Sequence, residues 1–216
     1  MQKKYNIILA DPPWSIAATA QIPSGRPNSR PYVAMRMVDI FSLPISEIAE
    51  KDSCLFLWAT SPLIPEALFC MRSWGFEYKC VAFTWIKRNT KADSLFWGMG
   101  WWTRSNPEFC LLGTRGSPKR DAKNVHSVID TKIEEHSKKP EEVKNKIVLL
   151  CGDKPRIELF ARTKTVGWDV WGNEIESDIK IEDARAEHYR NAGEHLTTAP
   201  CCSVEDSHIS ETETSA

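Results

Sequence analysis

The 216-residue sequence lacks any apolar run near the ~18–20 residues that a helix needs to cross a membrane. Residues 1–4 lead directly into a short apolar segment, without the apolar region and cleavage site of a signal peptide. We therefore expect no membrane segment and a cytoplasmic location. With 42% hydrophobic residues, the chain has the composition of one globular domain.

The sequence also lacks the Cys-x-x-Cys spacing that is typical of zinc and redox sites. Its seven cysteines are an odd number, so they do not pair completely within one chain. We expect buried free thiols and no metal site.

The formal net charge of −1 hides an uneven distribution. Residues 1–173 contain 25 Lys and Arg against 18 Asp and Glu, whereas residues 174–216 contain 3 against 11. A basic body favours a polyanionic partner such as nucleic acid. Ordinary surface charge is the alternative. The residues from 195 onward are rich in Ser, Thr and Glu, which favours a partly disordered end.

Short apolar runs alternate with helix-like segments. The expected strands cover residues 5–10, 54–59, 79–87, 108–113, 156–161 and 168–171, and the expected helices cover 44–50, 62–74 and 140–150. Strands that alternate with helices predict a mostly parallel sheet covered on both faces. The fold class is therefore an α/β three-layer sandwich.

The first expected strand ends in Asp11-Pro12-Pro13-Trp14. Prolines have fixed φ and no N–H, so this segment leaves the sheet as a stiff, extended loop whose carbonyls are left to accept hydrogen bonds. An exocyclic amine has two protons for the Asp11 carboxylate and the Pro12 carbonyl, and Trp14 offers a stacking face. This pattern fits a site for a planar, amine-bearing ring. The alternative is a Pro-rich loop with a buried Trp.

Other polar groups follow other expected strands. Ligands of parallel sheets bind beyond the carboxyl ends of the strands, so these groups are expected on one rim together with Asp11. They are Lys87 and Arg88 after the third strand, Arg162 after the fifth, and Asn173 and Glu174 after the sixth.

Several blocks along residues 5–175 together resemble the MT-A type family of adenine-N6 methyltransferases. The blocks are Asp11-Pro12-Pro13-Trp14, Leu55-Phe56-Leu57-Trp58, Ser73-Trp74-Gly75-Phe76, Thr84-Trp85-Ile86-Lys87, Glu108-Phe109-Cys110-Leu111-Leu112-Gly113, Ser137-Lys138-Lys139-Pro140-Glu141, Glu158-Leu159-Phe160-Ala161-Arg162, Gly167-Trp168 and Gly172-Asn173. The resemblance implies a Rossmann-like methyltransferase domain over residues 1–178 with the permuted β-type order, in which the catalytic motif precedes the cofactor motif. The acidic tail would then cover 179–216.

The resemblance also implies roles for individual residues. Asp11 and Pro12 would hold the target amine, Pro13 would shape the loop and Trp14 would flank the base. The implied cofactor is S-adenosylmethionine, and the residues matched to its site are Asp11, Lys139, Arg162, Asn173 and Glu174. The sequence departs from the family pattern at Ala161 and at Lys164-Thr165, which affects the contacts expected around the ribose.

Basic segments that follow the third and fourth strands are candidates for holding phosphates near the site. Their residues are Lys87, Arg88, Arg115, Lys119 and Arg120; an ordinary solvated loop is the alternative for each segment. DNA is the preferred substrate, because the chain is compact and contains no segment that resembles an RNA-binding module. An RNA adenine methyltransferase and a non-catalytic nucleic-acid-binding subunit remain the alternatives.

The segment between the third and fourth strands is rich in aromatic residues, with Trp97, Trp101 and Trp102 between glycines. These side chains either pack in the core or form a substrate-facing loop. The loops over 21–36 and 90–104 are the candidates for any sequence preference.

Overall fold

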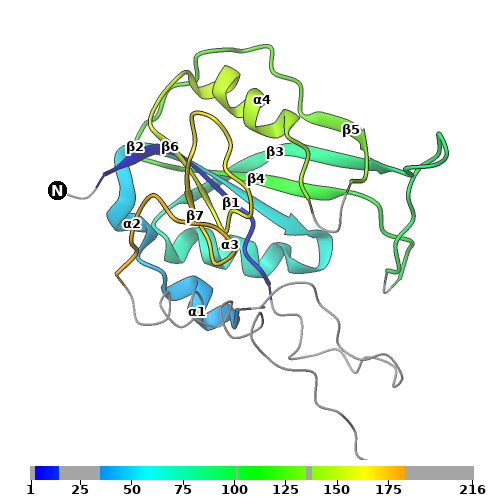
Figure 1. The fold of residues 1–216 in the computed structure, drawn as a ribbon, viewed down its shortest axis with the longest axis horizontal. Coiled ribbons are helices and arrows are strands. Elements are labelled where there is room, and N and C mark those ends of the chain that lie inside the picture. The colour runs from blue at the N-terminus through cyan, green and yellow to red at the C-terminus, as the bar shows by residue number, and fades with distance from the viewer. Residues whose placement is uncertain (1–2, 15–34, 101, 135–137, 183–216) are drawn as a thin grey trace, which may run out of the picture.

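The computed structural model describes residues 3–14, 35–100, 102–134 and 138–182, and these residues form one seven-stranded sheet (Figure 1). The strand order is β5-β3-β4-β2-β1-β6-β7. The strands are β1 (Tyr5–Ala10), β2 (Ala49–Thr60), β3 (Glu77–Arg88), β4 (Glu108–Arg115), β5 (Val128–Lys132), β6 (Arg156–Leu159) and β7 (Asp169–Trp171). The helices are α1 (Met37–Ser42), α2 (Ile45–Ile48), the 3-10 turn η1 (Ser61–Leu63), α3 (Ile64–Ser73) and α4 (Glu142–Cys151).

The sheet is mixed but mostly parallel, as the sequence predicted. β1 pairs in parallel with β2 and β6, β3 with β5, and β6 with β7. Only β4, among the described strands, runs antiparallel to its neighbours β2 and β3. The first residue of β4 therefore lies at the rim where the other strands end.

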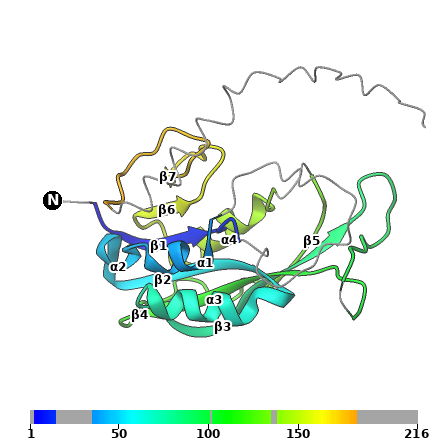
Figure 2. The same ribbon diagram turned by 90° about the horizontal axis from the view of Figure 1, so that it is seen from below.

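Helices cover both faces of the sheet, which confirms the three-layer sandwich. Leu55 and Leu57 of β2 pack with α1 and α3, whereas Phe56 and Trp58, which alternate with them, pack with α4. This alternation follows from the period of two along a strand. Figure 1 shows α4 on the opposite side of the sheet from α1 and α3, and Figure 2 shows β7, β6, β1 and β2 following one another across it.

Helix boundaries follow the prolines and glycines. α3 begins at Ile64 with Pro65 in its first turn, where the missing N–H leaves no hydrogen bond unmade. It ends at Ser73, one residue before the predicted end, and Gly75 follows with a φ of +83°. There the Gly75 N–H donates to the Arg72 carbonyl at 3.0 Å and the Phe76 N–H donates to the Met71 carbonyl at 2.9 Å. This pair of bonds is the Schellman ending that a glycine permits.

The sequence did not predict β5 or α1. In β5 only Ile129 is buried, because the strand lies at the edge of the sheet and most of its residues are polar or exposed. α1 is six residues long, too short to display a clear helical period. Among the described helices, none is long and apolar enough to cross a membrane. Most of the expected tail, residues 183–216, lies outside the described part of the chain, as do residues 15–34.

Candidate active site

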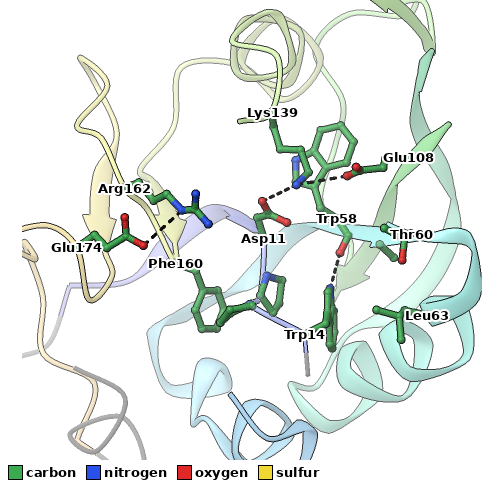
Figure 3. A pocket seen from close by; sticks show the side chains of 13 residues that line it. Asp11, Trp14, Trp58, Thr60, Leu63, Glu108, Lys139, Phe160, Arg162 and Glu174 are labelled. Carbon is green, nitrogen blue, oxygen red and sulfur yellow. Dashed lines mark hydrogen bonds and ion pairs between the residues drawn. The ribbon is translucent and has the colours of Figure 1, made fainter. Parts of the chain in front are cut away.

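Asp11 lies immediately after β1, the strand between β2 and β6, and faces Lys139 (Figure 3). The Lys139 Nζ donates to Asp11 Oδ2 at 2.6 Å. The Lys139 side chain is 16% exposed and the Asp11 side chain 34%, so the pair is open to solvent mainly on the Asp11 side. The Lys139 Nζ also lies 5.6 Å from the ring centroid of Trp58, in cation–π contact.

Glu108 completes this ion pair, and sequence reasoning missed its role. Its Oε2 lies 3.4 Å from the Lys139 Nζ, and its Oε1 accepts a hydrogen bond from the Lys87 Nζ. Glu108 reaches the rim because it is the first residue of an antiparallel strand. The sequence contained the residue in a family-like block, but only the reversed strand direction brings it beside Asp11.

Burial and charge shift the pKa values of this cluster. Burial raises the pKa of Asp11, although Lys139 opposes the shift. Burial also raises the pKa of Glu108, but Lys139 and Lys87 outweigh this effect and the net pKa is lowered. Burial lowers the pKa of Lys139, while Asp11 and Glu108 more than compensate, so the net pKa is raised. Lys139 therefore stays protonated, and of the two carboxylates that it contacts Asp11 binds a proton more readily than Glu108.

The loop after Asp11 is held by its own hydrogen bonds. The Trp14 N–H donates to the Pro12 carbonyl at 2.8 Å, and the Met35 N–H donates to the Pro13 carbonyl at 3.1 Å. Both carbonyls therefore accept hydrogen bonds, as expected, and their donors are backbone N–H groups of the protein itself. A carbonyl oxygen has two lone pairs, so Pro12 retains capacity for a second donor.

Trp14 is 8% exposed, and its indole N–H donates to the Trp58 carbonyl at 3.2 Å. The ring is therefore fixed in orientation while part of it faces a cavity. The cavity has a volume of about 130 Å³. It is lined by Asp11, Pro12, Pro13, Trp14, Trp58, Ala59, Thr60, Leu63, Glu108, Lys139, Phe160, Arg162 and Glu174.

A second cavity of about 140 Å³ adjoins the first. The two share Asp11, Trp58, Lys139, Phe160 and Arg162, and the second also reaches Leu9, Lys138, Pro140, Glu141, Val143, Lys144, Glu158 and Thr163. On its wall the Lys144 Nζ lies 2.8 Å from Glu158 Oε2 and donates to Thr165 Oγ1 at 2.6 Å. Burial raises the pKa of Glu158, with Lys144 opposing the shift.

Arg162 and Glu174 meet because β6 and β7 end close together. Phe160 has a φ of +62°, an uncommon conformation for a side chain of its size, and the Ala161 N–H donates to the Trp171 carbonyl at 3.0 Å. A Cβ on Gly172 would lie 2.2 Å from the Ala161 carbonyl oxygen, so only glycine fits there.

The Arg162 Nε therefore lies 3.6 Å from Glu174 Oε1, and both residues line the first cavity. Asn173 is half-buried and next to Glu174, but it is not among the residues that line the two adjoining cavities.

The predicted basic residues separate into two groups. Lys87 and Arg88 end β3 at the rim, where Lys87 pairs with Glu108 and Arg88 donates to both oxygens of Asp130 at 2.6 and 2.8 Å. Their charges are thus already engaged by carboxylates.

Arg115 is the last residue of the antiparallel β4, and Lys119 and Arg120 follow it, so all three lie at the opposite edge of the sheet. Arg115 pairs in register with Ser53 near the start of β2, and its guanidinium donates to the Ser46 carbonyl at 2.8 Å. Lys119 and Arg120 line a cavity with Cys54 and Cys151 at that edge. The expectation that this segment lies beside the site is corrected by the strand direction.

The chain matches the MT-A70 family over residues 5–174. It is 34% identical to the Type II methyltransferase M.MunI of a Mycoplasma species over 198 residues, which cover 84% of this chain and 82% of that protein. It is also 29% identical over 177 residues to the human N(6)-adenosine-methyltransferase catalytic subunit METTL3, covering 80% of this chain and 28% of that protein.

A putative N(6)-adenosine-methyltransferase MT-A70-like protein of Medicago truncatula is 29% identical over 184 residues, covering 83% of this chain and 28% of that protein. The chain thus spans only about a quarter of these two larger relatives but most of the bacterial one. Together with the Asp11 loop at the rim of a mostly parallel sheet, these matches show that the chain belongs to the MT-A70 family of adenine-N6 methyltransferases.

Proposed function

We propose that this protein transfers a methyl group from S-adenosylmethionine to the N6 amine of adenine in DNA. The observation that carries the proposal is the position of Asp11, whose carboxylate stands in the wall shared by two adjoining cavities. A reaction between two ligands needs such a boundary, because the reacting atoms must be held in line and close together.

The first cavity has the chemistry to hold an adenine ring. Trp14 is fixed by its indole hydrogen bond and Trp58 lines the same cavity, so aromatic and proline surfaces are available for stacking. Asp11 accepts one proton of the exocyclic amine, and the second lone pair of the Pro12 carbonyl accepts the other. These are the roles that we propose for Asp11, Pro12 and Trp14, with Pro13 shaping the loop.

The residues around the shared wall fit the charged and hydroxylated parts of S-adenosylmethionine. Lys139 and Arg162 are cations suited to a carboxylate, and Glu174 and Glu158 are acceptors suited to ribose hydroxyls. We propose Lys139, Arg162, Asn173 and Glu174 as the binding residues, with Asp11 at the boundary. When bound, S-adenosylmethionine supplies an electrophilic methyl group on a positively charged sulfur.

The protein's part in the chemistry is mainly orientation. Lys139 holds Asp11 Oδ2 at 2.6 Å, so the carboxylate presents one fixed geometry to the amine. Hydrogen bonds from the amine to Asp11 and Pro12 direct its lone pair away from these acceptors. Because burial raises the pKa of Asp11, its carboxylate binds the released proton more readily than an exposed aspartate does.

The preference for DNA is supported by the share of each relative's length that this chain matches. The match to the Mycoplasma Type II methyltransferase is 34% identical and runs through 82% of that protein. The N(6)-adenosine-methyltransferases share only 28% of their length with this chain. Methylation of RNA by the same site is the second candidate, favoured by the likeness to these N(6)-adenosine-methyltransferases.

The proposal is tested with labelled S-adenosylmethionine and matched DNA and RNA of mixed sequence, followed by detection of N6-methyladenine. Wild type is expected to label DNA, and Asp11→Ala to reduce labelling by at least ~100-fold. Asp153→Ala is the matched control, since Asp153 lies between α4 and β6 and pairs only with Arg156 among the contacts described. An Asp11→Ala enzyme as active as wild type would refute the role of Asp11. DNA binding without transfer would favour a non-catalytic subunit, and equal labelling of RNA would remove the preference for DNA.

A further inference from the structure

The connection between β3 and β4 exposes three large apolar side chains at its tip. Trp97 is 58% exposed, Met99 88% and Trp102 99%. The sequence left open whether these tryptophans pack in the core or face a substrate, and the exposure of Trp97 and Trp102 excludes the core. Trp101 lies outside the described residues. Clustered exposed apolar side chains mark a binding surface more often than a single exposed residue does.

The connection is a braced hairpin. The Gly98 N–H donates to the Ser105 carbonyl at 2.7 Å, and the Ser105 N–H donates back to the Gly98 carbonyl at 3.3 Å. Nearer the sheet, the buried Asn106 accepts from the Lys87 N–H at 3.0 Å and donates to the Lys87 carbonyl at 2.9 Å. The tip side chains are therefore presented on a supported backbone.

The base of this hairpin belongs to the active site. Its first anchor, Lys87, pairs with Glu108, and Glu108 lines the cavity with Asp11. In Figures 1 and 2 the connection extends beyond the end of the sheet, on the right of both views. The exposed tip thus stands outward from the rim at which the target adenine is proposed to bind.

The composition of the tip matches stacked bases flanked by phosphates. From residue 94 to residue 107 the sequence contains Arg104 and no acidic residue. The nearby carboxylate of Asp93 is paired with Arg88 at 3.1 Å. Aromatic side chains beside a cation are the usual means of binding exposed bases, and apolar side chains are also the usual wedges inserted between base steps.

We propose that Trp97, Met99 and Trp102 form a wedge that stacks on the bases beside the target adenine in duplex DNA and fills the space left when that adenine leaves the helix. This inference rests on the proposed function. An adenine inside a duplex must be extruded before it reaches Asp11, at a free-energy cost that a single strand avoids. An aromatic stack on a base is worth roughly 5- to 150-fold in binding, which offsets a large part of this cost.

The test compares mixed-sequence duplex DNA with the same DNA after heat denaturation, so that only the strand state differs. Trp97→Ala and Trp102→Ala are expected to lower kcat/KM for methylation of the duplex by at least ~5-fold each, and to leave methylation of denatured DNA within about twofold of wild type. Trp97→Phe keeps a stacking face and is therefore expected to retain most of the wild-type activity on the duplex, unlike Trp97→Ala. Val166→Ala is the control, because Val166 is also 99% exposed but lies between β6 and β7.

Three results would overturn the wedge. Equal losses of kcat/KM on duplex and denatured DNA would show that the tryptophans support the general structure of the site. No loss of kcat/KM on either substrate would show that they do not contact DNA. A wild-type dimer in sedimentation that becomes monomeric in Trp97→Ala would assign the tip to contact between protein subunits.

If wild type methylates neither form of DNA, the proposed function fails, and the wedge is then tested by DNA-binding measurements alone. The ratio of Kd for duplex to Kd for denatured DNA is then expected to rise at least ~5-fold in Trp97→Ala and to stay unchanged in Val166→Ala. An unchanged ratio in Trp97→Ala would refute the wedge independently of catalysis.

Discussion

Glu108 and Lys139 form one ion pair through Glu108 Oε2, at 3.4 Å, while the other oxygen of Glu108 binds Lys87. The same carboxylate thus connects the partner of Asp11 with the end of β3. Its side chain is 14% exposed, so the pair is shielded from much of the solvent screening that weakens surface ion pairs.

Glu108→Gln tests whether this connection positions Lys139. The amide keeps the size of the side chain but lacks the charge that attracts both lysines, so Lys139 no longer holds Asp11 in one geometry. We expect kcat to fall by about 10- to 100-fold with a smaller change in KM for DNA. Glu134→Gln is the control, because Glu134 pairs with Lys138 at the surface. An unchanged kcat in Glu108→Gln would exclude the positioning role.

The pH dependence of stability tests the lowered pKa of Glu108. Lys139 and Lys87 lower the pKa of Glu108 in the folded protein, so its contribution to stability is present above its ordinary pKa of 4.5 and is lost as the pH falls through the folded-state pKa. Urea unfolding between pH 7 and the acid range should show wild type losing more stability than Glu108→Gln. Parallel loss in the two proteins would contradict the lowered pKa.

Lys139→Met removes the cation that Asp11 and Glu108 share. Glu108 keeps its bond to Lys87, but the partly buried Asp11 is left without its paired cation, and we expect about 1–3 kcal/mol of destabilisation near neutral pH. The loss should shrink in acid, because burial already raises the pKa of Asp11 and removal of Lys139 raises it further. Urea unfolding as a function of pH measures this.

Lys138→Met is the control for that variant, because Lys138 is the adjacent residue and pairs with Glu134 at the surface. A pH-independent loss in Lys139→Met would point to packing instead of charge.

Trp14→Phe removes the indole donor to the Trp58 carbonyl while keeping an aromatic face. We expect a stability loss of about 1 kcal/mol and a raised KM for DNA, because the ring is no longer held in one orientation. Trp74→Phe is a matched control, since Trp74 donates to the Ile40 carbonyl at 2.9 Å in the core and lines neither of the two adjoining cavities. Equal KM values for DNA in the two variants would show that Trp14 does not contribute to binding of the base.

The salt dependence of DNA binding separates the cations at the two edges of the sheet. Arg104→Ala is expected to weaken binding and to reduce the slope of log K against log salt by about 1, because Arg104 is exposed beside the proposed wedge, whereas Lys87 is already bound by Glu108. Lys119→Ala and Arg120→Ala are expected to leave the slope unchanged, since both residues lie at the opposite edge of the sheet. A reduced slope in those variants would show that DNA contacts both edges.

Much of the fold followed from local patterns. Six strand positions, the helix that precedes Gly75 and the mostly parallel sheet were predictable, because buried runs, prolines and glycines influence the structure only of nearby residues. The positions of Asp11, Lys87 and Arg162 on one rim followed from the rule that parallel strands end together. The edge strand β5 was missed because its pattern is largely polar.

The sequence by itself determined the family, the Asp11 loop and the order of the strands that carry polar ends. Only the tertiary structure decided that β4 runs antiparallel, and this single reversal placed Glu108 beside Lys139 and moved Arg115 to the far edge. Strand direction depends on how the whole sheet pairs, which no short stretch of sequence encodes. The hydrogen bonds at Pro12 and the exposure of Trp97 likewise depend on which neighbours the folded chain supplies.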